Sequence, residues 1–185
     1  MVKIVGISGS LRSGSHNSAL LRAASQVLPA DVQLEIGTIK GIPLYDGDVE
    51  TKDGIPASVQ ALKNSIIQAD GLLLVTPEYN NSMPGVLKNA IDWLSRPPAD
   101  SGKVFGNKPV AIMGASPGGF GTILSQAAWL PVLRALGMHA WFGQKLLVSR
   151  AGQVFDADGE LTDEAVRKQL TAFMQGFAGF IQGKG

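Results

Sequence analysis

Residues 77–93 read P-E-Y-N-N-S-M-P-G-V-L-K-N-A-I-D-W and directly follow the apolar run 72–75. An apolar run of this kind is typical of a strand covered on both faces, so the pattern indicates a buried strand, a polar loop and then a helix. Two other apolar runs end in similar loops: G-S-L-R-S-G-S-H-N at 9–17, and G-A-S-P-G-G-F-G at 114–121. We expect the three loops to converge on one ligand.

The rest of the chain alternates between strand and helix patterns. Strand-like runs lie at 2–8, 33–39, 71–76, 109–115 and 145–149. Because strands covered on both faces form parallel sheets with right-handed helical crossovers, we expect an α/β fold with three layers. The carboxyl ends of such strands, where the connections reverse direction, form the usual ligand crevice.

Capping residues and prolines suggest where the helices begin and end. We expect a first helix from Asn17 or Ser18 to Pro29, and a second with Pro56 in its first turn. The other expected helices are a third capped by Ser82 with Pro84 in its first turn, a fourth at 122–136 containing Pro131 and capped by Gly137, and a fifth from about Thr162. The longest irregular stretch is 40–54, which is a candidate for function.

Composition narrows the function classes. The 185 residues, 45% of them apolar, are enough for one core, so we expect a single domain over 1–185. The net charge of +1, from 16 basic and 15 acidic residues, gives no basic stripe for nucleic acid or a membrane surface. The sequence has neither a membrane span nor a signal peptide pattern, so we expect a cytoplasmic protein. The absence of cysteine excludes disulfides and thiol catalysis.

The first loop is rich in hydrogen-bond donors. Gly9 would allow a tight turn, and the hydroxyls of Ser10, Ser15 and Ser18, with Arg12 and the free amides of the next helix, could surround a phosphate. The dinucleotide fingerprint and the nucleotide polyphosphate loop are both absent, which favours a monophosphate attached to a larger group. The alternative is a polar turn with a helix cap.

The second and third loops differ from the first in chemistry. Pro77 would stiffen the second loop, while Glu78, Tyr79 and Asn80 offer groups that could recognise the polar edge of a flavin ring. The third loop, 116–121, lacks side chains where a ring would lie against main chain, and its amides could stabilise negative charge. The alternatives are a turn capped by Ser82 and a flexible entry to the fourth helix.

Several other residues have structural interpretations. We expect the three tryptophans to lie in the core or at a subunit interface. We expect the acidic run 156–160 to be a turn, because its glycine is misplaced for a calcium loop and the distal glutamate is missing. We therefore expect no metal site.

The segments 9–17, 77–93 and 116–121 closely resemble the NADPH-dependent FMN reductase family, especially its quinone and chromate reductase branch. The resemblance implies a flavodoxin-like fold with five parallel strands in the order 2-1-3-4-5. It also implies non-covalent FMN, NADPH or NADH as co-substrate, and a homodimer or dimer of dimers. One departure is that Gly121, Thr122 and Ile123 stand where members of the branch often carry an arginine.

The same resemblance implies the site residues. The phosphate end of FMN would be held by Ser10, Leu11, Arg12, Ser15, Asn17 and Ser18; the ring would be lined by Pro77, Glu78, Tyr79 and Asn80; and the site would be closed by Ser116, Gly118 and Gly119. Tyr79 and Asn80 would shape the substrate face.

We therefore expect a ping-pong enzyme in which NAD(P)H reduces the flavin at N5 and a quinone, or a similar acceptor such as a flavin, an azo compound or chromate, takes the two electrons. The cofactor carries the chemistry in such enzymes, so no catalytic side chain is required. The alternative is a flavodoxin-type electron carrier without its own NAD(P)H oxidation. The near-neutral composition favours the enzyme, since it offers little long-range steering toward a charged redox partner.

Overall fold

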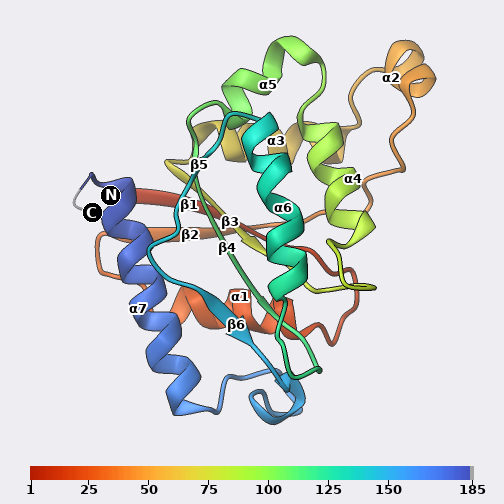
Figure 1. The fold of residues 1–185 in the computed structure, drawn as a ribbon. Coiled ribbons are helices and arrows are strands. Elements are labelled where there is room, and N and C mark those ends of the chain that lie inside the picture. Colours follow the sequence, from red (N-terminus) through yellow and green to blue (C-terminus); the bar gives the residue numbers. More distant parts are fainter. Residues whose placement is uncertain (184–185) are drawn as a thin grey trace.

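A computed structural model describes residues 1–183 as a parallel sheet between two helical layers (Figure 1). The sheet has the order β2-β1-β3-β4-β5, and β6 also pairs with β4. Every pairing is parallel. The strands are β1 (Val2–Ser8), β2 (Val32–Gly37), β3 (Gly71–Val75), β4 (Pro109–Ala115), β5 (His139–Ala140) and β6 (Leu146–Val148). The expected flavodoxin-like order is confirmed.

The expectation of five strands is wrong in one detail, because the last position of the sheet is divided between two short strands. The amide of Trp141 still donates to the carbonyl of Val110, after which residues 141–145 leave the ladder. The indole of Trp141 packs edge-on against Phe173, with ring centroids 5.0 Å apart. A side chain at Gly143 would collide with that indole, so the chain folds closely around it between the two strands.

Helices cover both faces of the sheet. The helices of the described residues are α1 (His16–Gln26), α2 (Gly47–Asp53), α3 (Ala57–Gln68), α4 (Gly85–Leu94), α5 (Pro98–Phe105), α6 (Ile123–Ala135) and α7 (Glu164–Ile181), with a 3₁₀ turn at Ala151–Gln153. Helices α1 and α7 pack on one face of the sheet, and α3, α4, α5 and α6 pack on the other. Among residues 1–183, no helix combines the length and apolar character that a bilayer crossing requires.

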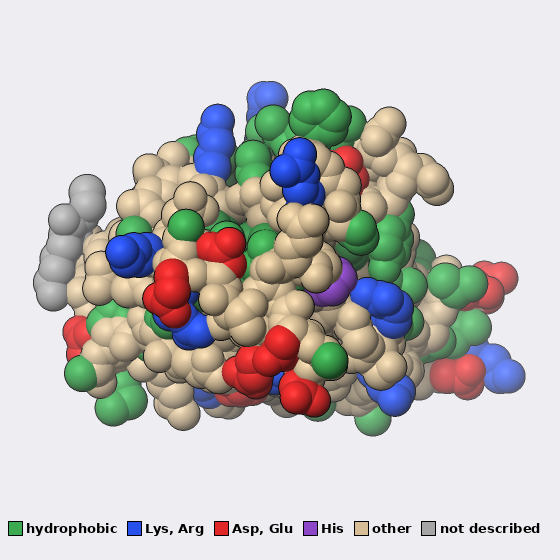
Figure 2. Space-filling view, turned by 90° about the horizontal axis from the view of Figure 1, so that it is seen from below, with side chains coloured by type: hydrophobic (Ala, Val, Ile, Leu, Met, Phe, Trp, Pro, Cys, Tyr) green, Lys and Arg blue, Asp and Glu red, His purple; other side chains and the backbone are tan. Residues whose placement is uncertain are grey.

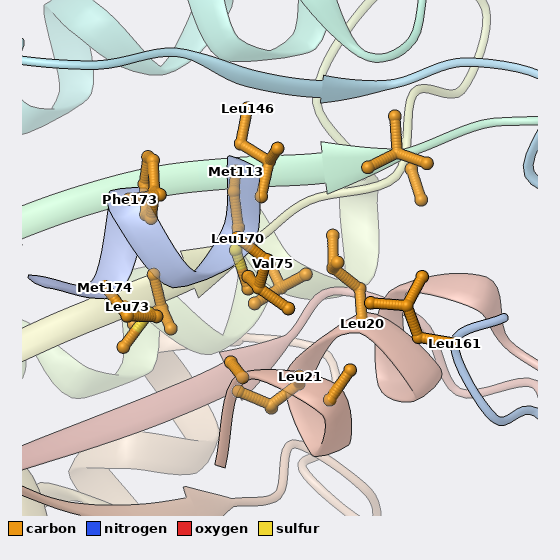
Figure 3. Close-up of a cluster of buried hydrophobic side chains, with 14 of the residues drawn as sticks. Leu20, Leu21, Leu73, Val75, Met113, Leu146, Leu161, Leu170, Phe173 and Met174 are labelled. Atoms are coloured by element: carbon orange, nitrogen blue, oxygen red, sulfur yellow. The ribbon is translucent and has the colours of Figure 1, made fainter. Parts of the chain in front are cut away.

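The apolar run of β3 is buried on both sides, as the sequence predicts. Leu73 and Val75 point toward α1 and α7, where Figure 3 shows Leu73 beside Met174 and Val75 beside Leu170. Residues 72 and 74 point into the core on the opposite face. Since successive side chains of a strand alternate between faces, each half of the run supports a different helical layer.

Several expected boundaries need correction. Ser82 does not cap the third helix; it pairs with Tyr79, and Pro84 occupies the cap position of α4. The first helix begins at His16, slightly earlier than expected, with Ser15 as its cap. The irregular stretch 40–54 contains the exposed helix α2, and α5 was not predicted.

Other expectations are confirmed. Gly137 adopts a left-handed φ of 67° after α6. Trp93 and Trp129 are fully buried, and Trp141 packs against α7. The run 156–160 is a turn in which a carboxylate oxygen of Asp156 accepts from two following amides. Basic and acidic side chains are interspersed over the face of the molecule shown in Figure 2, in line with the balanced composition.

Candidate functional site

Three loops leave the carboxyl ends of the adjacent strands β1, β3 and β4 and pack against one another. The amide of Gly9 donates to the carbonyl of Val75 over 2.8 Å, and the amide of Thr76 donates to that of Met113 over 2.9 Å. The hydroxyl of Tyr79 reaches Ser10 Oγ at a long 3.5 Å. The structure therefore brings the predicted loops 9–15, 77–82 and 116–121 to one end of the sheet (Figure 1).

Gly9 is needed for a reason other than the expected tight turn. Its φ lies outside the left-handed region, so its conformation does not itself require glycine. A Cβ at this position would lie 2.9 Å from both Leu87 Cδ2 and Pro77 Cδ. Glycine therefore permits close packing of the first loop on the second.

The polar residues at the start of α1 have different local roles. Ser15 Oγ accepts from the amide of Ser18 over 3.2 Å, which caps the helix, and Ser18 Oγ donates to Ser8 Oγ. Asn17 is buried, and its amide group exchanges two hydrogen bonds with the backbone of Ala115, at 2.8 and 2.9 Å. Asn17 thus joins the first loop to the end of β4.

Positive charge in the first loop is available to a ligand. Arg12 is exposed, and none of the ion pairs formed within residues 1–183 involves it. The pKa of the neighbouring His16 lies below its usual value, because partial burial disfavours the imidazolium and the Arg12 cation repels it. An anion bound beside Arg12 and the first amides of α1 would find compensating charge.

The second loop contains a two-residue hairpin turn. Tyr79 and Ser82 exchange two backbone hydrogen bonds of 3.1 and 3.0 Å. Between them, Asn80 and Asn81 have φ of 51° and 61°. Positive φ at both central residues characterises a type I′ turn, a conformation that asparagine tolerates better than most side chains. This turn fixes the backbone at Tyr79 and Asn80, where a ring edge is predicted to bind.

Glu78 occupies an unexpected position. Its Oε2 accepts hydrogen bonds from the amides of Leu124 and Ser125, at 2.8 and 3.0 Å, in the first turn of α6. The side chain therefore connects the second loop to the helix that follows the third. This carboxylate therefore occupies two of the first-turn amides of α6 that a ligand could have used.

The third loop offers uncovered backbone. A Cβ built at Gly119 meets no atom within 4 Å, and one at Gly118 meets only Ser116 Oγ at 3.9 Å. The hydroxyl of Ser116 donates to the carbonyl of Gly121, and the amide of Arg150 donates to that of Gly118. These bonds hold the loop in place, and the space beside the two glycines is free of other protein atoms, so a ligand could approach the main chain there.

Sequence patterns missed two groups of residues near the loops. The hydroxyls of Thr76 and Ser125 are buried 2.8 Å apart, and the indole of Trp129 donates to Thr76 Oγ1 over 3.2 Å. The only signal for this group is a hydroxyl residue at the strand exit and another in a mostly apolar helix.

The second missed group fixes the stretch 40–54 against α4. Asn89 Oδ1 accepts from the amide of Tyr45 over 2.8 Å, and Asn89 Nδ2 donates to the carbonyl of Pro43 over 2.8 Å. Glu50 accepts from Arg96 and from the Tyr45 hydroxyl, which lowers the pKa of the Glu50 carboxyl. Function for this stretch remains a prediction.

Residues 2–153 match the model of a family described as NADPH-dependent FMN reductase. The chain belongs to this family. The match covers most of the chain, including the three loops, and confirms the expected enzyme class and the expected use of FMN and NAD(P)H.

Individual relatives agree with the family assignment. An NAD(P)H-dependent FMN reductase of Pseudomonas aeruginosa is 46% identical over 174 residues, covering 94% of this chain and 92% of the relative. A 2-hydroxy-1,4-benzoquinone reductase of a Burkholderia species is 40% identical, covering 98% and 97%. The solved structure of a flavoenzyme NAD(P)H:(acceptor) oxidoreductase from Paracoccus denitrificans matches with a TM-score of 0.88 and 32% identity, over all of both chains.

Proposed function

We propose that this family member is an FMN-dependent NAD(P)H oxidoreductase that passes two electrons to quinones or similar acceptors by a ping-pong mechanism. The observation that carries the proposal is the open backbone of Gly118 and Gly119, in the loop after β4, together with the preformed turn at Tyr79–Ser82, in the loop after the neighbouring strand β3. A flat ring can approach main chain only where side chains are absent. The quinone reductase name of one relative supports the acceptor class.

We assign the phosphate end of FMN to Ser10, Leu11, Arg12 and the capped start of α1. The exposed guanidinium and the first-turn amides of α1 that precede Ser18, whose own amide is capped by Ser15, support this assignment, because both favour an anion. Asn17, with its amide bound to Ala115, would act there by fixing the loop. Ser15 and Ser18 would act in the same way, through the cap and the bond to Ser8.

FMN, when bound, would supply the two-electron chemistry between NAD(P)H and the acceptor. The chain would supply orientation: residues 77–80 on one side of the ring, and Ser116, Gly118 and Gly119 on the other. Tyr79, 47% exposed, is placed to shape the entrance for both substrates. Since one entrance would serve both, the first product has to leave before the acceptor enters, which is the reason for proposing a ping-pong order.

No side chain of the three loops is needed as a proton donor. Glu78 is the acidic residue in these loops, and its carboxylate accepts two amides of α6. We therefore propose that protons exchange with solvent at the open entrance.

We also propose a homodimer or dimer of dimers located in the cytoplasm. Exposed apolar side chains support assembly: Ile123, Leu130 and Phe142 line one groove of about 220 Å³ between α6 and the segment 141–147. A patch of this kind on a soluble chain often forms an interface.

An anaerobic double-mixing experiment tests the function. Protein loaded with FMN is mixed with NADPH and then with benzoquinone, while the flavin absorbance is recorded. We expect bleaching by NADPH and full reoxidation by the quinone without accumulation of a semiquinone. A loaded protein inert toward both NADPH and NADH would instead support a flavodoxin-type carrier.

A further inference from the structure

The carboxylate of Glu78 takes the place of a missing helix cap. The cap residue of α6, Thr122, makes no side-chain bond to the helix amides; its hydroxyl accepts from Gln126 Nε2 instead. Glu78 Oε2 accepts from the second and third amides of the helix, at 2.8 and 3.0 Å. A carboxylate is well suited to this place, since it satisfies two free donors and complements the positive end of the helix dipole.

A buried hydroxyl group reinforces the same connection. The Oγ atoms of Ser125 and Thr76 lie 2.8 Å apart, at the first turn of α6 and the end of β3. The space between them and β4 is filled, because a Cβ at Gly114 would lie 2.1 Å from the carbonyl oxygen of Thr76 and 2.3 Å from Thr122 Oγ1. The exit of β3 and the start of α6 are therefore held together by packing and by polar contacts.

The glycine loop 116–121 lies between two fixed ends. At its start, the amide of Ser116 donates to the carbonyl of Val148, and the carbonyl of Ser116 accepts from the amide of Ala151. At its far end, the loop runs directly into the turn of α6 that Glu78 caps. The position of this far end relative to residues 77–82 thus depends in part on the Glu78 side chain, which binds the helix amides directly.

From these contacts we infer that Glu78 is a positioning residue that sets the separation of the second and third loops, and so prepares the slot in which the flavin ring is proposed to lie. The inference rests on the proposed function for the identity of the ligand. Without Glu78, the far end of the glycine loop would keep only its other contacts, such as the bond from Ser116 Oγ to the carbonyl of Gly121. The ligand would then have to supply part of the ordering, and that would reduce affinity.

The test compares four apoproteins: wild type, Glu78→Ala, Glu78→Gln and Asp163→Ala. Asp163 is a matched control, because its Oδ1 caps α7 by accepting the amide of Val166 over 2.9 Å, and α7 carries none of the three loops. Two properties are measured for each variant: the dissociation constant of FMN by quenching of flavin fluorescence, and amide hydrogen exchange without FMN.

Loss of a helix cap of this type should weaken FMN binding by about 10-fold in Glu78→Ala. Glu78→Gln should lie between wild type and Glu78→Ala, since its amide oxygen still accepts but carries no charge. Exchange in the apoprotein should accelerate at residues 117–125 in both Glu78 variants. Asp163→Ala should accelerate exchange only at the start of α7 and should leave FMN binding within about 2-fold of wild type.

Wild-type FMN affinity in both Glu78 variants, or equal weakening in Asp163→Ala, would overturn the inference. If Glu78→Ala does not fold, Glu78→Gln alone decides between these outcomes. A wild-type protein that fails to bind FMN would instead contradict the proposed function, and the hydrogen exchange result would still show whether Glu78 orders the loop.

Discussion

Replacement of Gly119 by alanine separates a ligand role of the glycine loop from a folding role. The added Cβ meets no atom within 4 Å, and the φ of Gly119 lies outside the left-handed region, so alanine fits the folded apoprotein without strain. Because alanine also restricts the unfolded chain, we expect the free energy of unfolding to rise by roughly 0.4–1 kcal/mol or to stay unchanged.

In the loaded protein, the same methyl group would stand where the flavin is proposed to lie. Forcing an extra methylene-sized group into a packed space costs about 1–3 kcal/mol, and each 1.4 kcal/mol changes a dissociation constant about tenfold. We therefore expect FMN binding to weaken by roughly 10- to 100-fold, as measured by quenching of flavin fluorescence against apoprotein.

Gly102→Ala provides the matched control. Gly102 lies inside α5, and its added Cβ also meets nothing within 4 Å. This variant should show a similar or slightly higher unfolding temperature and unchanged FMN affinity. Unchanged FMN affinity in Gly119→Ala as well would refute the placement of the ring over the glycine loop.

Three further predictions concern the turn, the phosphate loop and the subunit surface. Asn80→Ala should lower the free energy of unfolding, measured in urea, by about 1 kcal/mol, because alanine is strained at a φ of 51°. Asn80→Gly should leave that free energy nearly unchanged, and equal losses in the two variants would argue against the turn. The pKa of His16 is lowered in the folded protein, so just below pH 6.5 the unfolded chain binds more protons than the folded protein does. The free energy of unfolding therefore falls as the pH falls through that window. His16→Gln should reduce the loss of unfolding free energy between pH 7.5 and pH 5. An NMR titration that gives His16 a pKa at or above 6.5 would contradict this prediction. The side chain of Phe142 is 70% exposed and lines the α6 groove. If this groove is a subunit interface, Phe142→Ser should lower the molecular mass measured by light scattering. An unchanged mass would exclude Phe142 from the interface.

The layered fold could be predicted from sequence because its signals are local. The L-L-L-V run of β3 is buried on alternate sides by two helical layers, and such burial leaves a continuous apolar stretch. The division of the last strand could not be predicted, because it depends on how Trp141 packs against Phe173 on a distant helix. The single domain over 1–185 stays a prediction.

The site could be predicted only as a set of loops. The order of the motifs placed residues 9–17, 77–82 and 116–121 at one end of the sheet, and parallel topology brings such segments together. The partners of individual side chains were beyond sequence analysis: Asn17 binds Ala115, and Glu78 binds the amides of α6, 46 and 47 residues away. These contacts connect residues far apart in sequence, so no local pattern encodes them.

A crystal structure of the FMN-loaded protein would show where the flavin ring and its phosphate bind. We expect the ring to lie between residues 77–80 and the backbone of Gly118 and Gly119, with the phosphate beside Arg12 and the first amides of α1. FMN bound elsewhere, for example in the groove beside α6, with the three loops free of contact, would contradict it.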